Sequence, residues 1–216
     1  MMSNHPHRST VAAPTRRRVA VGYTLLEVIA TLAAFGLVSL ITVPAIFEWT
    51  AKQRVDASAA ELVGTLRRAR SYAISHSTKV GLKFHLEPSE SGVTRVFFAL
   101  YRDGDLDGVR SDDIARGTDP RVTRSRQLAT FGSQVRFGFP AGLQPADPSD
   151  PRRRLDRLDD PIRFNRSDIA SFGPIGTATP GSLYITDGRR LAVVRVTSRS
   201  GRVRVMHWDP YQERWE

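Results

Sequence analysis

The longest apolar stretch of the chain runs from Val28 to Phe47 and contains no charged residue. At a rise of about 1.5 Å per residue, a helix of this length spans about 30 Å, the thickness of the hydrocarbon core of a bilayer. The pattern therefore predicts a membrane-spanning helix, to which we assign residues 23–47.

Residues 51–75 keep a helical pattern of a different kind. Apolar residues recur at spacings of three and four and form a stripe on one face, whereas basic residues fall mostly off it. The stripe consists of Val55, Ala59, Leu62, Leu66, Ala69 and Ala73. We therefore expect residues 48–78 to continue the helix beyond the membrane and to pack this stripe on a sheet.

Strand patterns dominate from Val80 onward, and no helical period follows that residue. Asp187-Gly188 is typical of a hairpin turn, and a second turn is expected at residues 199–201. The predicted strands are 80–86, 93–101, 134–139, 162–164, 182–186, 191–197 and 202–208. Residues 140–161 are rich in Pro, Asp and Arg and are predicted to form a mobile surface loop. The pattern thus predicts an α+β fold, with a long N-terminal helix packed on an antiparallel sheet domain of residues 79–216.

The charge, cysteine and histidine contents exclude several kinds of functional site. The formal net charge is +10, of which the first 22 residues carry +4 through four arginines and no acid. The chain has no cysteine, which excludes disulfides, thiolate metal sites and cysteine nucleophiles. The five histidines form no recognisable metal-binding spacing, and no G-x-S-x-G motif is present. We therefore expect no enzymatic activity.

A lone carboxylate, Glu27, lies at the start of the apolar run, and three arginines, residues 16–18, precede it. A carboxylate within a membrane helix costs about 2.5 kcal/mol or more, so it normally has a partner. If the chain were cut after Gly22, the new amine of Tyr23 would lie one helical turn from Glu27. The two groups could pair within one chain or between neighbouring chains. The alternative is an uncleaved signal anchor, with the arginines remaining in the cytoplasm.

The stretch Gly22-Tyr-Thr-Leu-Leu-Glu27-Val resembles the signal of type IV prepilins. That resemblance implies that a prepilin peptidase removes residues 1–22 and N-methylates Tyr23. Glu27 takes the fifth place of the mature chain, and Pro44 takes a place at which many pilins carry a helix-kinking proline. Gly36 is a second weak point in the helix. Together, Glu27, Gly36 and Pro44 are the residues we expect to serve assembly.

Two further segments resemble the GspH/FimT family of minor pseudopilins. The first is the helix-to-strand stretch ELVGTLRRARSYAISHSTKVGLKF, in which Ala69, Arg70 and Ala73 carry the match. The second is FGPIGTATPGSLYITDGRRLAVVRVTSRSGRVRVMHW, near the end of the chain. The resemblance covers residues 19–86 and 172–208, and the part between them matches poorly.

Membership of this family would imply a structural subunit of the type II secretion pseudopilus. The protein would be a single-pass inner-membrane protein with a cytoplasmic N-terminus and a periplasmic sheet domain. Its partners would be other pseudopilins in a helical filament, the prepilin peptidase and the inner-membrane assembly platform. The alternative is a FimT-like minor pilin of a type IV pilus that binds DNA for uptake or primes pilus assembly.

The DNA alternative depends on arginines near the end of the chain. Residues 188–208 contain six arginines and no acid: Arg189, Arg190, Arg195, Arg199, Arg202 and Arg204. Residues 201–204, Gly-Arg-Val-Arg, resemble a signature linked to DNA uptake, and Arg202 and Arg204 would share one strand face. Arg199, in the turn, could join them. A solvated strand face is the structural alternative.

One acidic stretch is a candidate for calcium. Asp103, Asp105 and Asp107 alternate before Gly108, as at the start of a calcium loop, but the twelfth place holds Ile114 rather than a glutamate. A solvated acidic hairpin tip is the alternative. Gly173, Gly176 and Gly181 could suggest a phosphate cradle. Because no helix or lysine completes that motif, we predict a turn there.

Overall fold

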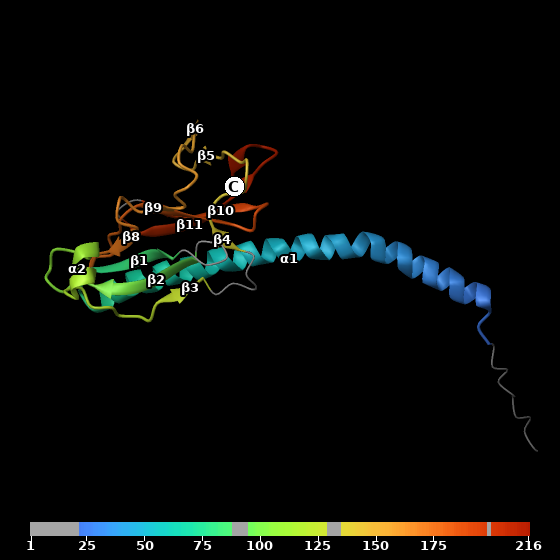
Figure 1. Cartoon of the computed structure of the whole chain (residues 1–216), viewed down its shortest axis with the longest axis horizontal. Helices are drawn as coiled ribbons and strands as arrows, with labels where there is room; N and C mark the ends of the chain where they lie inside the picture. The colour runs from blue at the N-terminus through green and yellow to red at the C-terminus, as the bar shows by residue number, and fades with distance from the viewer. Residues whose placement is uncertain (1–21, 88–94, 129–134, 198–199) are drawn as a thin grey trace, which may run out of the picture. The chain divides into compact units, whose positions relative to one another are not determined.

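The computed structural model describes residues 22–87, 95–128, 135–197 and 200–216 (Figure 1). The chain divides into two compact units, residues 1–45 and 46–216. The first helix, α1 (Leu25–Ser75), contributes to both of them. Each unit is described by itself below.

The first unit is the N-terminal part of α1, and its helix begins just after the predicted cleavage site. Thr24 precedes the helix, and its hydroxyl Oγ1 accepts a hydrogen bond of 3.2 Å from the backbone N–H of Glu27. Thr24-x-x-Glu27 thus has the sequence of a capping box, in which a threonine and a glutamate satisfy the free donors of the first helical turn. This hydrogen bond stabilises the first turn of α1 locally.

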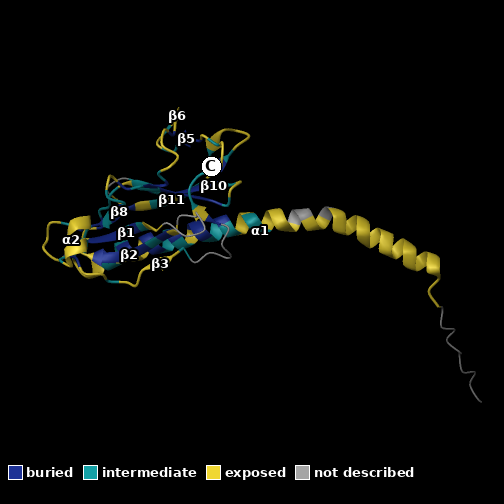
Figure 2. Cartoon of the chain, viewed as in Figure 1, coloured by how far each residue is buried: buried dark blue, intermediate teal, exposed yellow. Residues whose placement is uncertain are grey.

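The apolar side chains of this unit are exposed along the helix (Figure 2). The hydroxyl groups of Thr31 and Thr42 donate hydrogen bonds of 2.8 Å to the carbonyls of Val28 and Val38, so these polar groups are satisfied within the helix itself. No helix in the described part of the chain is both long and apolar enough to cross a membrane. The side chain of Pro44, which we predicted to kink the helix, lies outside the described residues.

The described residues of the second unit form the C-terminal part of α1, three antiparallel sheets and a short helix. The first sheet has the order β3-β2-β1-β8. The second has the order β12-β11-β10-β9-β4, and β7 also pairs with β9; β5 and β6 pair with each other. Their bounds are β1 Val80–Glu87, β2 Arg95–Arg102, α2 Ser111–Arg116, β3 Arg126–Gln127, β4 Arg136–Phe137, β5 Ala146–Asp147, β6 Asp150–Arg154, β7 Ile162–Arg163, β8 Ile169–Phe172, β9 Gly181–Thr186, β10 Leu191–Thr197, β11 Arg202–Asp209 and β12 Arg214–Trp215.

The C-terminal part of α1 packs against both large sheets through the predicted stripe. All six stripe residues are buried, and they share one core with residues of both sheets, including Phe84, Phe98, Phe172, Ile185 and Val194. The prediction that this helical face is buried is therefore confirmed. Because apolar side chains from one helix face and two sheets meet here, burial of this surface supplies most of the driving force for folding this unit.

Several predicted strands agree closely with the observed ones. The predicted strands 182–186, 191–197 and 202–208 correspond to β9, β10 and β11 within one residue at each end. The predicted strand 134–139 is reduced to Arg136–Phe137, with residue 134 outside the described part. The expectation of no helix after Val80 is wrong, because α2 forms at Ser111–Arg116. A helix of this length is too short to show a hydrophobic period, and its end is set by Gly117 in a left-handed conformation.

Residues 140–161, which we predicted to form a mobile surface loop, are largely exposed but contain a short hairpin that packs on the sheet domain. β5 and β6 pair with each other, and Leu155 is only 2% exposed. This segment covers the face of the second sheet that points away from α1, in a core that includes Ala146, Tyr184 and Trp208. Because the segment is mostly polar, its composition did not indicate the few apolar residues that pack on the sheet. The indole N–H of Trp215 also donates a 2.7 Å hydrogen bond to the carbonyl of Ala146.

Burial in this second core raises the pKa of Tyr184 to about 12, since desolvation disfavours the phenolate. The unfolded chain loses this proton near pH 10, whereas the folded chain retains it up to about pH 12. The contribution to stability is therefore complete below pH 10 and is lost as the pH rises through the folded pKa. Between pH 9 and pH 12, we expect the free energy of unfolding to fall by about 2 kcal/mol less in Tyr184→Phe than in the parent chain. Urea unfolding of both chains across this range measures the difference, and parallel pH profiles would contradict the assignment.

Candidate functional site

Arg70 joins three segments that lie far apart in the sequence. Its side chain extends from α1, and its Nε donates a 3.1 Å hydrogen bond to the carbonyl of Gly176. A methyl group added to Gly201, in the turn before β11, would lie 3.0 Å from Arg70 Nε and 3.2 Å from the Gly176 carbonyl oxygen. Gly176 and Gly201 both have positive φ angles, +81° and +64°, which favour glycine. The guanidinium of Arg70 is therefore held where two glycine turns approach α1.

The loop from Gly173 to Ala178 is a closed turn and not an open anion cradle. The N–H of Gly173 donates to the carbonyl of Thr177 at 2.8 Å, and the N–H of Gly176 donates to the carbonyl of Gly173 at 2.9 Å. Because the backbone donors of both glycines are already used, they are not available to a phosphate group. This geometry confirms the prediction of a turn at this position.

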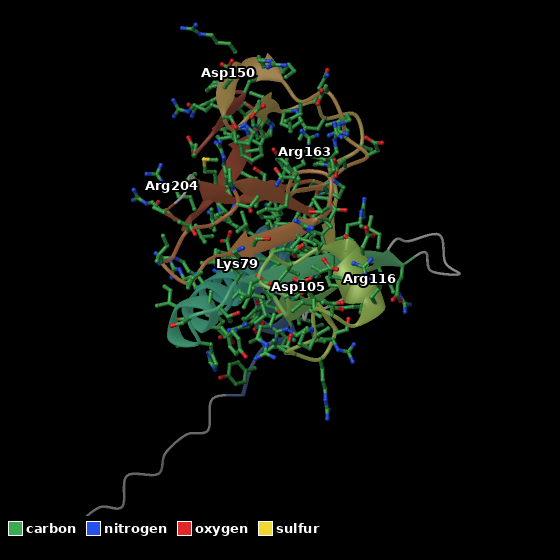
Figure 3. All side chains as sticks on the ribbon, turned by 90° about the vertical axis from the view of Figure 1, so that its left-hand side faces the viewer. Lys79, Asp105, Arg116, Asp150, Arg163 and Arg204 are labelled. Carbon is green, nitrogen blue, oxygen red and sulfur yellow. The ribbon has the colours of Figure 1, made fainter. Side chains whose placement is uncertain are left out.

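Arg202 and Arg204 lie on one exposed face of β11, as their spacing predicted. Both are exposed, whereas the intervening Val203 and the following Val205 are half-buried against the main core. In the antiparallel pairing of β10 and β11, Arg204 lies directly opposite Arg195. Figure 3 shows Arg204 at the surface of the sheet domain, well separated from Asp105. Arg199 lies outside the described residues.

Two of the other arginines in this region have structural roles. Arg190 forms an ion pair of 3.3 Å with Asp187 and donates a 3.0 Å hydrogen bond to the carbonyl of Glu48 in α1. Arg195 donates hydrogen bonds of 2.6 Å to the carbonyl of Pro148 and to the hydroxyl of Ser149, which ties β10 to the β5–β6 hairpin. The six-arginine pattern therefore overstates the number of cations available to a partner.

The acidic stretch forms a loop held by two buried carboxylates. Asp103 Oδ1 accepts a 2.7 Å hydrogen bond from the N–H of Leu106, and its Oδ2 accepts one of 3.0 Å from the N–H of Gly108. Asp119, which is 1% exposed, accepts hydrogen bonds of 3.0 Å from the N–H groups of Gly104 and Arg110. The sequence analysis did not include Asp119, and no local pattern marks it. These hydrogen bonds give both buried acids a role in shaping the loop.

Two overlapping groups of acids in this loop are close enough to share a cation. Single carboxylate oxygens of Asp103, Asp105 and Asp119 lie within 4.8 Å of one another, as do those of Asp105, Asp107 and Asp113. Desolvation raises the pKa of both Asp105 and Asp107, and the hydrogen bond between these carboxyls lowers the pKa of Asp105 and raises that of Asp107. When all these effects are combined, the pKa of Asp105 lies below its usual value and the pKa of Asp107 lies above it. Two carboxylates in contact favour a shared proton or a bound cation.

Removal of one buried acid should measure the structural role of this loop. We expect Asp119→Ala to destabilise the chain by about 2–3 kcal/mol, because two backbone N–H groups lose their acceptors. The exposed Asp105→Ala is the matched control and should change stability by less than about 0.5 kcal/mol. Urea unfolding measures both, and equal effects of the two substitutions would contradict this role of Asp119.

The calcium hypothesis remains a prediction, and calorimetry on the full chain tests it. Binding should produce heat on titration and a higher unfolding midpoint in millimolar calcium, and both signals should be lost in Asp105→Ala. No heat and an unchanged midpoint would end the hypothesis and leave Asp103 and Asp119 as loop-forming residues alone.

The histidines of the described residues take part in local contacts. His76 stacks on Tyr72 at 3.9 Å between ring centroids. The pKa of His85 is lowered, chiefly by burial and secondly by the charge of Lys83. His207 Nε2 lies 3.5 Å from a carboxylate oxygen of Asp56 in α1. His5 and His7 lie outside the described part.

The residues of the predicted processing site are accessible at the start of the described chain. Gly22 is exposed, Tyr23 is 84% exposed, and Glu27 lies exposed in the first turn of α1. Gly36 has no atom within 4 Å of the position that a side chain would take. A methyl group at that position would therefore meet no steric obstacle.

The chain matches no protein-family model, no curated protein sequence and no solved structure. The resemblance to the GspH/FimT family thus rests on the two segments that carry it, and residues of both segments meet at Arg70.

Proposed function

We propose that this chain is a minor pseudopilin of the GspH/FimT type, a structural subunit of a type II secretion pseudopilus. Its role would be assembly and not catalysis. The prepilin peptidase would remove residues 1–22 and methylate Tyr23. The apolar helix would hold the protein in the inner membrane, with the sheet domain in the periplasm, until the assembly platform extracts it into the filament.

The arrangement at the start of α1 is the observation that carries this proposal. Gly22 lies three residues before the first residue of a locally capped helix, Glu27 lies in the first turn of that helix, and the apolar side chains that follow are exposed. A helix with an apolar surface of this length needs an apolar environment, either lipid or the apolar helices of neighbouring subunits. Both environments occur in the life of a pilin-like subunit.

The carboxylate of Glu27 fits the same proposal. Cleavage after Gly22 would create an amine on Tyr23, four residues before Glu27. In an apolar environment the two opposite charges stabilise each other if they come within contact distance. A pair between neighbouring chains would also fix the stagger between their helices, and so select the neighbour.

The contact at Arg70 supports the family resemblance in the second unit. The helix motif around Arg70 belongs to the first family-like segment, and the glycine loop at 173–178 and the Gly201-Arg-Val-Arg204 strand belong to the second. They meet at one place through Arg70, Gly176 and Gly201. A shared structural junction accounts for why these two segments would occur together in one family.

DNA uptake is the alternative function, favoured by the exposed Arg202 and Arg204. If those residues contact phosphates, alanine at both positions should weaken binding to duplex DNA and lower its salt dependence by about two released counterions. Arg152→Ala with Arg153→Ala is the matched control, because both arginines are exposed on β6. If the protein is instead a secretion pseudopilin, the parent chain and both double variants should bind DNA equally, weakly and non-specifically. Fluorescence anisotropy at several salt concentrations measures this binding.

A further inference from the structure

A groove of about 580 Å³ runs between α1 and the outer edge of the second sheet. Small residues of α1, Ala59, Ala60 and Gly64, line one side of it, and Val205 and His207 of β11 line the other. The groove lies wholly within residues 46–216, so the inference below does not depend on the proposed pilin-like function. Small side chains on a helix allow another backbone to approach closely.

The edge of β11 beside this groove has backbone groups directed away from its neighbour β10. The N–H of His207 donates to the carbonyl of Glu216 on the outer side, at 2.9 Å. Because donor direction alternates along an antiparallel strand, the N–H and C=O groups of Val203 and Val205 also point outward. β12 pairs with β11 only at Trp208 and Asp209. Within the described part of the chain, no backbone hydrogen bond reaches the outward groups of Val203 and Val205.

The two faces of β11 differ in chemistry along this edge. Val203 and Val205 face the helix, whereas Arg202 and Arg204 occupy the opposite face, together with Met206 and Trp208. The side chains of Arg202 and Arg204 form no ion pair with any described residue, and neither does that of Arg67 at the groove. A strand added here would meet an apolar surface on one face and cations on the other.

We propose that this edge of β11 binds an extended segment of a partner protein by strand addition, and that this segment alternates acidic and small apolar residues. Its backbone would exchange hydrogen bonds with Val203 and Val205. Its apolar side chains would pack on Ala60, Val63 and Gly64 of α1. Its acidic side chains would lie beside Arg202 and Arg204, their neighbours on the same sheet face.

The dimensions of the two elements agree with this arrangement. Gly201 lies against Arg70 and His207 lies against Asp56, so β11 runs antiparallel to α1 along the groove. Six residues of strand extend about 20 Å at 3.3 Å each. Fourteen residues of helix extend about 21 Å at 1.5 Å each. The free edge is therefore flanked by helix over its whole length, which leaves room for a segment of about six residues.

The charges also disfavour non-specific pairing of this edge with other strands. Lysine and arginine on an edge strand disfavour pairing with neutral or basic strands and with a second copy of the same edge. An acidic segment would instead be attracted by the two arginines. Duplex DNA would use the arginines but could not form backbone hydrogen bonds with Val203 and Val205 or fill the groove beside Gly64, so the observations favour a peptide.

A labelled peptide of defined sequence tests the proposal on the full chain in detergent micelles. The probe is acetyl-Ser-Glu-Val-Glu-Val-Glu-Ser-amide, and the comparison peptide carries lysine in place of each glutamate. We expect saturable binding of the acidic probe only, with fluorescence anisotropy as the readout. Gly64→Leu should weaken binding by about tenfold or more, because leucine fills the groove without changing the charge.

Three further variants separate strand addition from simple charge attraction. Gly64→Ala, which leaves the groove largely open, should bind the acidic probe like the parent chain. Val205→Pro removes one outward N–H but no hydrogen bond to β10, and should also weaken binding by about tenfold. Arg202→Glu with Arg204→Glu should reverse the preference toward the lysine peptide. Thermal melts of each variant establish that it remains folded.

Two results would overturn the proposal. One is binding of the acidic probe that Gly64→Leu and Val205→Pro leave unchanged while both variants remain folded. The other is displacement of the probe by duplex DNA together with insensitivity to Gly64→Leu, which would assign the surface to nucleic acid. Failure of either kind would leave processing at Gly22 untouched, because the two sites lie in different parts of the chain.

Discussion

A chain carrying Glu27→Gln should still be cut after Gly22 but should enter the filament at least about tenfold less than the parent chain. Glutamine keeps the size and hydrogen-bonding capacity of glutamate, so the start of α1 is preserved. It removes the negative charge that would pair with the Tyr23 amine of a neighbouring subunit. The amount of this chain in sheared surface filaments, normalised to the amount in the membrane, measures the effect.

The structure supplies a matched control for this experiment in Thr24. Its hydroxyl accepts the N–H of Glu27 and so caps the same helical turn. Thr24→Val should cost about 1 kcal/mol of local helix stability but leave the carboxylate in place. Incorporation that falls equally in Thr24→Val and Glu27→Gln would mean that Glu27 acts through helix capping and not through its charge.

Gly201→Val should destabilise the sheet domain by about 2–4 kcal/mol, the second large effect that we expect. A valine at a φ angle of +64° is strained, and its side chain would be pressed against Arg70 and the Gly176 carbonyl. Urea unfolding followed by tryptophan fluorescence measures the change. The same valine in an Arg70→Ala background should cost only about 1–2 kcal/mol, the backbone contribution alone.

That pair of substitutions forms a double-mutant cycle for the junction at Arg70. Coupling between the two positions is expected, because the added side chain and the guanidinium compete for one space. Purely additive effects would show that Arg70 does not constrain the turn before β11. The cycle therefore tests whether the two family-like segments depend on one another energetically.

The main elements of this fold could be predicted because their patterns extend over many residues. The stripe on α1 comprises six residues at helical spacing. β9 and β10 are largely apolar runs of six and seven residues, and β11 begins with alternating arginine and valine. Such patterns make helix and strand distinguishable from sequence alone. The burial of the stripe follows directly, because its six residues must leave water together.

The errors arose in short segments whose structure depends on distant contacts. α2 is six residues long, and the β5–β6 hairpin owes its order to a few apolar residues, among them Ala146 and Leu155, within a polar segment. Composition indicated a loop at residues 140–161. What composition does not show is that Tyr184 and Trp208 leave an apolar face on the second sheet that something must cover.

Individual side-chain roles were the least accessible from sequence. Arg190 and Arg195 counted toward a basic patch, yet they bind Asp187, Glu48, Pro148 and Ser149. Arg70 was identified from sequence only as a residue that carries the family resemblance, and its contact with Gly176 appears only in the folded chain. The capping role of Thr24 was not among our predictions, although Thr-x-x-Glu before an apolar run is a known sequence signal of a helix start.

Mass spectrometry of the mature N-terminus tests the central proposal most directly. The full chain is produced together with a prepilin peptidase and recovered from the membrane. The account predicts a chain that begins at N-methylated Tyr23, and an unprocessed chain when Gly22 is replaced by valine. An intact leader in the unsubstituted chain, or a cut at any other position, would contradict it.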